Sequence, residues 1–576
     1  MRSIILLTAI AVLFSTVVIA EGLADDNRFE TIAKAYIEEL LRLNPETATV
    51  LGDHRYDARL TDYSLDGIKR ERAATEKYLA DLGKIDAREL STQNSVDYRI
   101  LREQLESRLY AIDTLREREW NPLAYNPGNA IFALVAREFA PLGERLMSVK
   151  GRLAGLPAVV AAAKANLKNP PRVHTETAII QNKGNIALIT TELEPFIARA
   201  PELRAELAPV QAAAKSALED YGRFLEKDLL PRSTGDFRIG DQKFRRKLAY
   251  ALSSDLSKEE IMRRAQADLQ ATQGEMYQTA LPLYRKFFPA ETDAAKLTDR
   301  KGVIKAVLAK LAGQRPTNES IVPRAKDMLR ETTEFVRGKN LVTVPSEPLN
   351  IIVMPEFQRG VAVAYCDSAG PLETNGETFY AISPTPADWK PARVESFFRE
   401  YNDYMLRDLT IHEAMPGHYL QLMHSNKFRA PTLVRAIFGS GTFVEGWAVY
   451  AEQVMAEHGY GGAEVKMQQL KMRLRLIINA MLDQSVHTAG MAEGEAMRLM
   501  IEEGFQEEGE AAGKWRRACL SSSQLSTYYV GSLEVGDIHR AYEAKHGRQS
   551  DMKRMHDQML SFGSPAPKYV KELMGL

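Results

Sequence analysis

Two histidines and a glutamate stand close together in the segment that runs from Leu409 to His418. The segment holds His412, Glu413 and His418, so two imidazoles and a carboxylate fall within seven positions. These groups are good ligands for a borderline-soft cation such as Zn²⁺. A glutamate beside the first histidine can also polarise a metal-bound water. The residue types therefore predict a zinc site that carries out hydrolysis.

The spacing of the two histidines differs from that of the usual zinc helix, in which they are four residues apart on one face. His412 and His418 are six apart, and on a regular helix this spacing would rotate the second ring by about 240°. Pro416 removes a helix hydrogen bond and Gly417 permits unusual dihedral angles. We therefore expect a local break that returns His418 to the metal. The alternative is that both histidines are ordinary helix or turn residues.

A catalytic zinc site needs a third protein ligand, and Glu445 is the leading candidate. It begins a predicted helical segment, and Glu452 lies two turns further on, nearly on the same face. One of the two could bind the metal while the other supports a histidine from behind. Gly446 suggests that another element packs closely here. The alternative is that both glutamates are surface carboxylates.

Two further groups of residues could assist the reaction. Asp483 and His487 stand four apart on a predicted helix, so the carboxylate could orient the imidazole. The hydroxyl of Tyr528 could stabilise the oxyanion that forms when water attacks a carbonyl. The alternatives are a structural hydrogen-bonded pair and a core aromatic residue.

The elements that must position these residues are mainly helical. Apolar residues recur at spacings of three and four from Phe29 to about Arg337, and again from Pro391 to the C-terminus. Between these regions, short β-branched or aromatic runs predict a small antiparallel sheet. The fold class is therefore mainly α, with residues 25–345 helical and residues 346–576 holding the sheet and the metal-site helices. The predicted strands are Leu349–Met354, Gly360–Tyr365 and Glu377–Ala381.

The N-terminus has the pattern of a secretory signal. A charged start at Arg2 precedes an apolar run from Ile4 to Ile19, which is shorter than the roughly 20 residues of a spanning helix. We predict a signal peptide over residues 1–24 and a mature protein without a membrane span in the periplasm or outside the cell. The absence of a cysteine near the cleavage point argues against a lipid-anchored form.

Composition excludes some classes of partner and site. Lysines and arginines number 75 against 76 aspartates and glutamates, and the charges are interspersed, so we expect no nucleic-acid partner. Cys366 and Cys519 are the only cysteines, which excludes both a disulfide framework and a thiolate zinc site. Whether these two cysteines pair is left open.

Four segments resemble, in the same order, those of the bacterial domain-of-unknown-function family 885, whose members resemble the gluzincin metallopeptidases. The segment ending in Pro-Gly-His and the Glu-Gly-Trp-Ala segment are specific, whereas the N-terminal match is weaker. The resemblance spans nearly the whole mature chain. The segments are Asn44-Pro45 to Gly52-Asp53, His412 to His418, Glu445 to Ala448 with Tyr450, and Asp483 with His487 followed by Tyr528 to Gly531.

The resemblance implies one gluzincin-like, mainly helical body over residues 25–576, with the zinc site in a deep cleft. It implies that Glu413 is the general base and that Tyr528 or His487 stabilises the oxyanion. Family members often carry Gly-Trp just after the histidine that corresponds to His487, whereas this chain has Thr488 there. The implied zinc ligands are His412, His418 and Glu445.

Together these features predict an exported zinc peptidase that cleaves amide bonds of peptides, with one Zn²⁺ per chain and Glu413 as the base. The predicted strand Glu377–Ala381 could be an edge strand that pairs with an extended peptide. A second interpretation keeps the zinc in an amidase or esterase that acts on a small modified amino acid. A third is a non-catalytic helical periplasmic binding protein.

Overall fold

Helices form most of residues 24–340, as the apolar periodicity predicts. The computed structural model describes residues 24–354, 363–373, 376–386, 389–547 and 550–576, so the predicted signal peptide lies outside the described residues except for its last position. Residues 24–43 are helical. The helices that follow are α2 (Pro45–Leu51), α3 (Leu65–Leu82), α4 (Thr92–Tyr110), α5 (Gly128–Ala136), α6 (Leu142–Asn166), α7 (Arg172–Ala187), α8 (Glu194–Ala198), α9 (Arg204–Arg223), α10 (Asp241–Leu252), α11 (Lys258–Phe287), α12 (Ala294–Thr298), α13 (Arg300–Leu311) and α14 (Ile321–Lys339).

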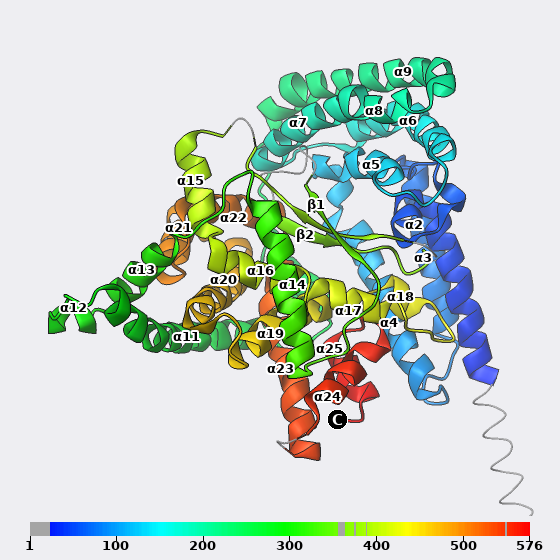
Figure 1. The fold of residues 1–576 in the computed structure, drawn as a ribbon. Helices are drawn as coiled ribbons and strands as arrows, with labels where there is room; N and C mark the ends of the chain where they lie inside the picture. Colours follow the sequence, from blue (N-terminus) through cyan, green and yellow to red (C-terminus); the bar gives the residue numbers. More distant parts are fainter. Residues whose placement is uncertain (1–23, 355–362, 374–375, 387–388, 548–549) are drawn as a thin grey trace, which may run out of the picture.

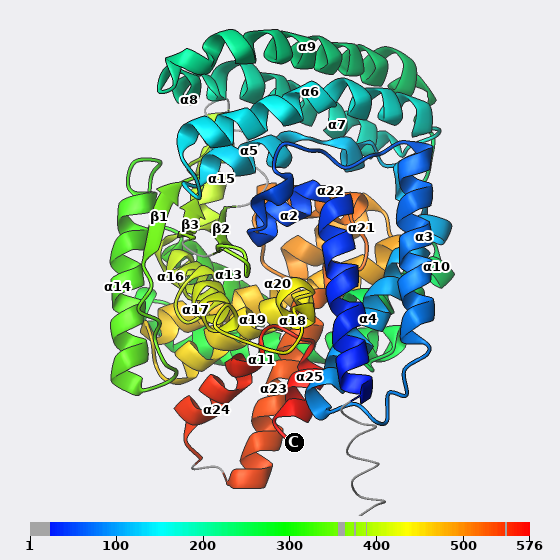
Figure 2. The same ribbon diagram turned by 90° about the vertical axis from the view of Figure 1, so that its right-hand side faces the viewer.

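Helices α5 to α9 form a layer at one end of the molecule (Figures 1 and 2). Within this layer α6 packs against α5 and α9. Of the helices in the described residues, α6 is the one long and apolar enough to cross a membrane by length and composition, and 44% of its most apolar window is buried. A helix in the core of a protein passes the same test of length and composition. Helix α6 packs against α5 and α9 as such a core helix does.

The sheet has three strands in the order β1-β3-β2. Strands β1 and β3 are parallel, with Leu349 opposite Thr378, whereas β2 and β3 are antiparallel. The prediction of an antiparallel sheet is therefore wrong for one of the two pairings. The reason is that the chain passes from β1 to the far side of the sheet, forms β2 and then returns to place β3 between them. The strands are β1 (Leu349–Val353), β2 (Ala364–Asp367) and β3 (Thr378–Ile382).

The strand predicted at Glu377–Ala381 is β3, which is central and has a neighbour on each side. It therefore cannot be the edge strand that pairs with a peptide. The strand predicted at Gly360–Tyr365 lies partly outside the described residues; its described part overlaps β2. Strand β1 contacts α14 and β2 contacts α16, so the sheet lies directly beside the helix that carries His412.

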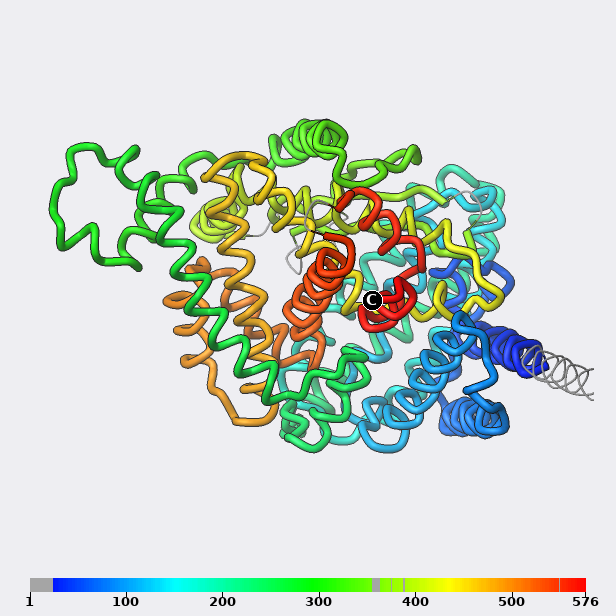
Figure 3. The backbone as a smooth tube through the Cα atoms, turned by 90° about the horizontal axis from the view of Figure 1, so that it is seen from below, coloured from blue at the N-terminus to red at the C-terminus, as the bar shows by residue number. Residues whose placement is uncertain are grey.

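The C-terminal region is helical again from Pro391. Helix α19 packs along α23, and α20 contacts α11, α16 and α23. Seen from below, the segment around α12, between α11 and α13, extends to one side of the molecule (Figure 3). The helices are α15 (Pro391–Glu400), α16 (Asp403–Glu413), α17 (His418–Ser425), α18 (Val434–Ile437), α19 (Gly441–Glu457), α20 (Gly462–Thr488), α21 (Glu493–Arg498), α22 (Glu508–Leu520), α23 (Ser526–His546), α24 (Met552–Met559) and α25 (Pro567–Leu573).

Apolar packing joins the two regions that the sequence distinguishes. Val434 and Tyr569 pack in the same core as Phe29 and Leu101. Farther along, the backbone N–H of Leu372, after β2, donates to the carbonyl oxygen of Leu51. The N-terminal helices therefore support the segment that carries β2, which itself contacts the helix of His412.

Candidate metal centre

A break between two helices brings His412 and His418 together. Helix α16 starts at an N-cap, Asn402, whose side chain accepts two backbone hydrogen bonds, and it ends at Glu413. Helix α17 begins at His418 after four non-helical residues. A Cβ atom at Gly417 would overlap the carbonyl oxygen of His412, so only glycine fits this tight return. The expected local break is present at the predicted place.

Helix α19 brings Glu445 to the same point. A Cβ atom on Gly446 would overlap the backbone of Gly531 in α23, so the two helices touch here without side chains between them. This is the close approach that Gly446 predicts. The indole N–H of Trp447 donates to the carbonyl oxygen of Pro416 at 2.9 Å and thereby ties α19 to the segment between α16 and α17.

The three predicted ligands converge. Single ligand atoms of His412, His418 and Glu445 all lie within 4.8 Å of one another. The Nε2 atom of each histidine is 3.5 Å from Oε2 of Glu445. In a tetrahedral zinc site with bonds of about 2.1 Å, ligand atoms are roughly 3.4 Å apart. This Oε2 atom is buried without a hydrogen-bond partner among the described residues. The donor set therefore fits a zinc ion in both chemistry and spacing.

Glu452 occupies the far side of the His412 ring. Its Oε1 atom lies 2.6 Å from Nδ1 of His412, which leaves Nε2 directed at Glu445. The two glutamates are thus separated by position: Glu445 lies with the ligand atoms and Glu452 supports the histidine. This is the arrangement by which carboxylates fix the tautomer and orientation of metal-bound imidazoles.

Asp408 is a buried acid of this centre that the sequence does not single out. It lies one turn before His412 on α16, and it is 1% exposed. Burial raises its pKa well above the usual range, and the nearby charge of Glu452 adds to the rise. The sequence signal was present, because positions four apart share a helix face. The sequence does not show that this helix face is buried next to the carboxyl group of Glu452.

The electrostatics of the centre favour a cation between the two histidines. Burial by itself would lower the pKa of His412, but the carboxylates of Glu445 and Glu452 outweigh it, and the pKa rises well above the usual value. Burial would raise the pKa of Glu445, yet both histidines together lower it. Positive charge is therefore stabilised at this point, and a metal ion can replace the proton that supplies it.

Glu413 faces strand β2. Its Oε2 atom accepts the backbone N–H of Cys366 at 3.0 Å, and the residue is 8% exposed. The carboxylate is thus held in one orientation next to the helix break that brings His418 to His412.

The two cysteines are both free, which settles the question of pairing left by the sequence.

Tyr528 borders the centre, but His487 does not. Tyr528 lies one turn before Gly531 on α23, and the charge of Glu445 helps burial to raise its pKa. Its hydroxyl oxygen accepts a hydrogen bond from Arg517 at 3.0 Å. Arg517 was not predicted, because α22 carries no motif that would mark it.

His487 forms hydrogen bonds to the backbone at the end of α22. Its Nε2 atom lies 3.0 Å and 2.9 Å from the carbonyl oxygens of Ala518 and Ser521, at the end of α22. The carboxylate of Asp483 accepts hydrogen bonds from Ser523 and Ser526 and makes none to His487. The geometry therefore does not support the expected orienting pair or a place for His487 beside the metal ligands.

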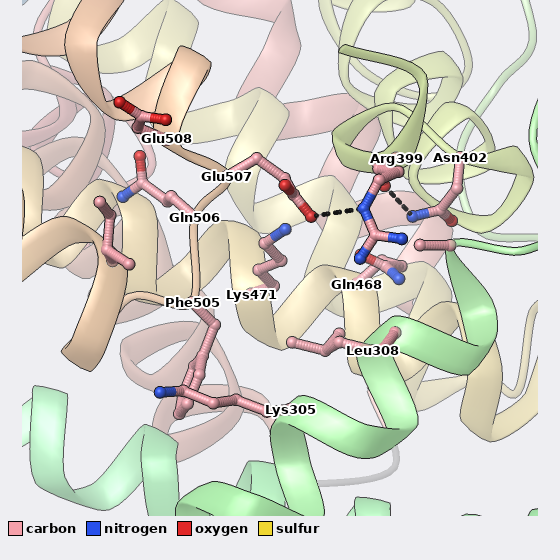
Figure 4. A pocket seen from close by; sticks show the side chains of 13 residues that line it. Lys305, Leu308, Arg399, Asn402, Gln468, Lys471, Phe505, Gln506, Glu507 and Glu508 are labelled. Atoms are coloured by element: carbon pink, nitrogen blue, oxygen red, sulfur yellow. Dashed lines mark hydrogen bonds and ion pairs between the residues drawn. The ribbon is translucent and has the colours of Figure 1, made fainter. Parts of the chain in front are cut away.

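A separate cavity of about 340 Å³ lies beside α13, α15 and α20 (Figure 4). An ion pair between Arg399 and Glu507 lies at its edge, with the Nε and Oε1 atoms 3.1 Å apart. None of the metal-centre residues lines it. A deep cleft around the metal centre stays a prediction.

Comparison with known proteins places the chain in a family. It matches the family model described as "Bacterial protein of unknown function (DUF885)" over residues 45–574. A solved structure from Shewanella oneidensis, provisionally described as a lipoprotein of unknown function, is 33% identical with a TM-score of 0.79 and covers 95% of this chain and 100% of that chain. Another, from Colwellia psychrerythraea and provisionally described as a lipoprotein, has the same fold at 17% identity and a TM-score of 0.76, with 96% and 98% covered.

No curated protein sequence matches the chain. The family model nevertheless extends over all the residues of the candidate metal centre and over nearly all of the described helices. The chain therefore belongs to the DUF885 family of bacterial proteins of unknown function.

Proposed function

We propose that this chain is an exported, zinc-dependent hydrolase of the peptidase type, similar to the gluzincins. The observation that carries the proposal is the convergence of His412, His418 and Glu445 on one point, next to the base candidate Glu413. Three protein ligands that leave a coordination position open are typical of catalytic zinc, whereas structural sites are closed by four.

A zinc ion held there would supply a water of lowered pKa and would polarise the carbonyl of the substrate. The carboxylate of Glu413, oriented by the N–H of Cys366, accepts the proton of the attacking water. Tyr528 donates its hydroxyl hydrogen bond to the oxyanion that forms on the substrate. Glu452 holds the His412 ring while charge develops.

Strand β2 supports a peptide as the substrate. It lies at an edge of the described sheet, and the N–H of Cys366 points away from β3, to Glu413. In an antiparallel pair alternate residues turn both polar backbone groups outward, so Ala364 shares this orientation. We infer that β2, in place of the predicted β3, aligns an extended peptide beside Glu413.

Export is supported by two observations. The first residues have a charged start and an apolar run of the length of a secretory signal. The structures from Shewanella oneidensis and Colwellia psychrerythraea are both described provisionally as lipoproteins, a class of exported protein. We infer that the mature chain acts outside the cytoplasm.

The proposal is tested by zinc content and peptide hydrolysis in the purified mature protein and in His418→Ala. We expect one zinc per chain in the wild type, loss of metal in the variant, and activity that disappears on chelation and returns with zinc. His424→Ala is the matched control, because His424 lies on the same helix but bonds the carbonyl oxygen of Thr343.

Peptides of graded length separate a peptidase from an amidase or esterase, since a peptidase loses rate when substrate residues far from the cleaved bond are removed. Metal in the wild type without hydrolysis of any substrate would favour the binding protein. A wild type without metal, unaffected by chelators, would overturn the zinc hydrolase.

A further inference from the structure

We propose that Arg517 and Lys514, on one face of α22, form a subsite for a carboxylate of the substrate. This inference rests on the proposed function, because it names the class of substrate that the metal centre receives. It predicts that the substrates are peptides with a carboxylate close to the cleaved bond, either at the C-terminus or on an acidic side chain.

A short chain of contacts connects Arg517 to the metal centre. Glu445 directly precedes Gly446, where α19 touches α23 at Gly531. Tyr528 lies one turn before Gly531 on α23, and its hydroxyl accepts a hydrogen bond from Nη2 of Arg517 at 3.0 Å. The guanidinium group is therefore the next group outward from the tyrosine that borders the ligand Glu445.

Arg517 has neutral partners only. Its Nη2 atom donates to the hydroxyl of Tyr528 and to Oε1 of Gln524 at 2.8 Å. No carboxylate lies within ion-pair distance of Arg517 in the part of the chain that the structure describes, whereas many other arginines of the molecule have one. A guanidinium group is matched in shape and charge to a carboxylate, which it binds through two parallel hydrogen bonds.

Lys514 adds a second cation to the same helix face, because residues three apart on a helix are neighbours. Its side chain is 10% exposed, and its nearest carboxylate, Glu510, is 4.0 Å away, beyond hydrogen-bond distance. Glu510 already accepts a hydrogen bond from Tyr401 at 2.9 Å and lies 3.8 Å from Arg475. The ammonium group on this largely buried side chain thus has no carboxylate within hydrogen-bond distance.

The two cations lie within the field of the metal centre. The charge of Glu445 acts on Lys514, on Arg517 and on Tyr528. A peptide backbone spans about 3.3–3.6 Å per extended residue. With Tyr528 at the oxyanion and Arg517 in direct contact with Tyr528, the bound carboxylate lies within about one or two residues of the cleaved bond.

The test measures binding, so that it does not depend on turnover. Two pairs of peptides are titrated calorimetrically into zinc-loaded Glu413→Gln protein and into chelated wild type. The first pair is tri-alanine with a free C-terminus and tri-alanine amide. The second pair is Ala-Glu-Ala amide and Ala-Gln-Ala amide. We expect a ligand with a free carboxylate to bind at least about tenfold more tightly than its neutral counterpart. In Arg517→Gln this preference should disappear, and in Lys514→Met it should weaken.

Arg516→Gln is the matched control, because Arg516 is the adjacent arginine on α22 and donates to the hydroxyl of Thr177. It should keep the full preference, and circular dichroism of each variant checks the fold. A preference for the free C-terminus assigns the subsite to the terminal carboxylate, and a preference for Ala-Glu-Ala amide over Ala-Gln-Ala amide assigns it to a side chain.

Equal binding of acid and neutral ligands would overturn the subsite even if hydrolysis is found. A lower kcat in Arg517→Gln with an unchanged preference would also overturn it and would place Arg517 at the oxyanion. If chelated protein still prefers carboxylate ligands but zinc-loaded wild type hydrolyses no peptide, the subsite is supported and the zinc-hydrolase proposal is overturned.

Discussion

Oε1 of Glu452 lies 2.6 Å from Nδ1 of His412, on the side of the ring opposite Glu445. The contact joins α19 to α16 through the middle of the molecule, where both side chains are buried. It decides which ring nitrogen faces the metal centre, because a nitrogen that donates to a carboxylate cannot bind a metal. The affinity of the centre should therefore depend on Glu452 as well as on the ligands.

Replacing Glu452 by glutamine should weaken zinc binding by about tenfold or more, in the range observed for such supporting residues. The reason is that the neutral amide no longer stabilises the positive charge that the ring shares with the metal. Zinc affinity is measured by competition with a chromophoric chelator. Glu457→Gln, at an exposed position of the same helix, should leave the affinity unchanged. Equal affinities in the two variants would remove Glu452 from the centre.

Replacing Glu413 by glutamine should lower kcat for peptide hydrolysis by roughly 10²–10⁴-fold with zinc still bound, because the amide cannot accept the proton of the attacking water. The amide oxygen can still accept the N–H of Cys366, so the local structure should persist. Metal content and single-turnover rates are measured on the same preparation. Full activity in this variant would exclude Glu413 as the base.

Replacing Gly417 by alanine should disrupt the return of the chain between the two histidines. The added Cβ atom would overlap the carbonyl oxygen of His412, and such overpacking costs about 1–3 kcal/mol. We expect a lower free energy of unfolding and loss of zinc binding together. Gly338→Ala is the control, since it lies in α14 with no atom within 4 Å of the added group. Normal zinc affinity in Gly417→Ala would show that the break tolerates a side chain.

The stability of the fold should decrease in acid. Burial is the main cause that lowers the pKa of both His174 and His556 to about 4, whereas an unfolded histidine titrates near about 6.5. Between these pH values the unfolded chain binds protons that the folded chain does not, so the free energy of unfolding falls as the pH drops from about 6.5 to 4. Each histidine contributes up to about 3 kcal/mol, at about 1.36 kcal/mol per pH unit.

Urea denaturation at a series of pH values checks this dependence. His174→Gln should flatten the curve below about pH 6.5, because one of the buried histidines with a lowered pKa is gone. His424→Gln, at a less buried position on α17, should keep the slope of the wild type. Identical slopes in all three proteins would assign the acid sensitivity to other groups.

Some properties of the centre follow from local sequence alone. The donor types of His412, Glu413 and His418 are given directly, and the Pro-Gly step between them predicts the helix break that the structure has. Gly446 likewise predicts the close contact of α19 with another helix. Such features depend on residues within one or two turns of one another, where backbone sterics decide the conformation.

Other properties depend on how distant segments pack. The sequence favoured Glu445 as the third ligand but left Glu452 open, because both lie on nearly the same face of one helix. The position of α19 against α16 separates their roles. The prediction of antiparallel pairing was wrong for β1 and β3 for the same kind of reason. Alternation of side chains predicts a strand but not its neighbour, and β3 lies between β1 and β2 only because the chain returns.

The same division explains the residues that the sequence overlooked or misplaced. His487 is four residues from Asp483, yet the end of α22 supplies carbonyl oxygens that hold its ring. Arg517 belongs to no motif and reaches Tyr528 only because α22 and α23 meet. The sequence alone determined the donor types, the break and the helical character of the chain. Tertiary structure decided which donors meet, because contacts between separate elements arise from packing of whole faces and leave no fixed spacing in the chain.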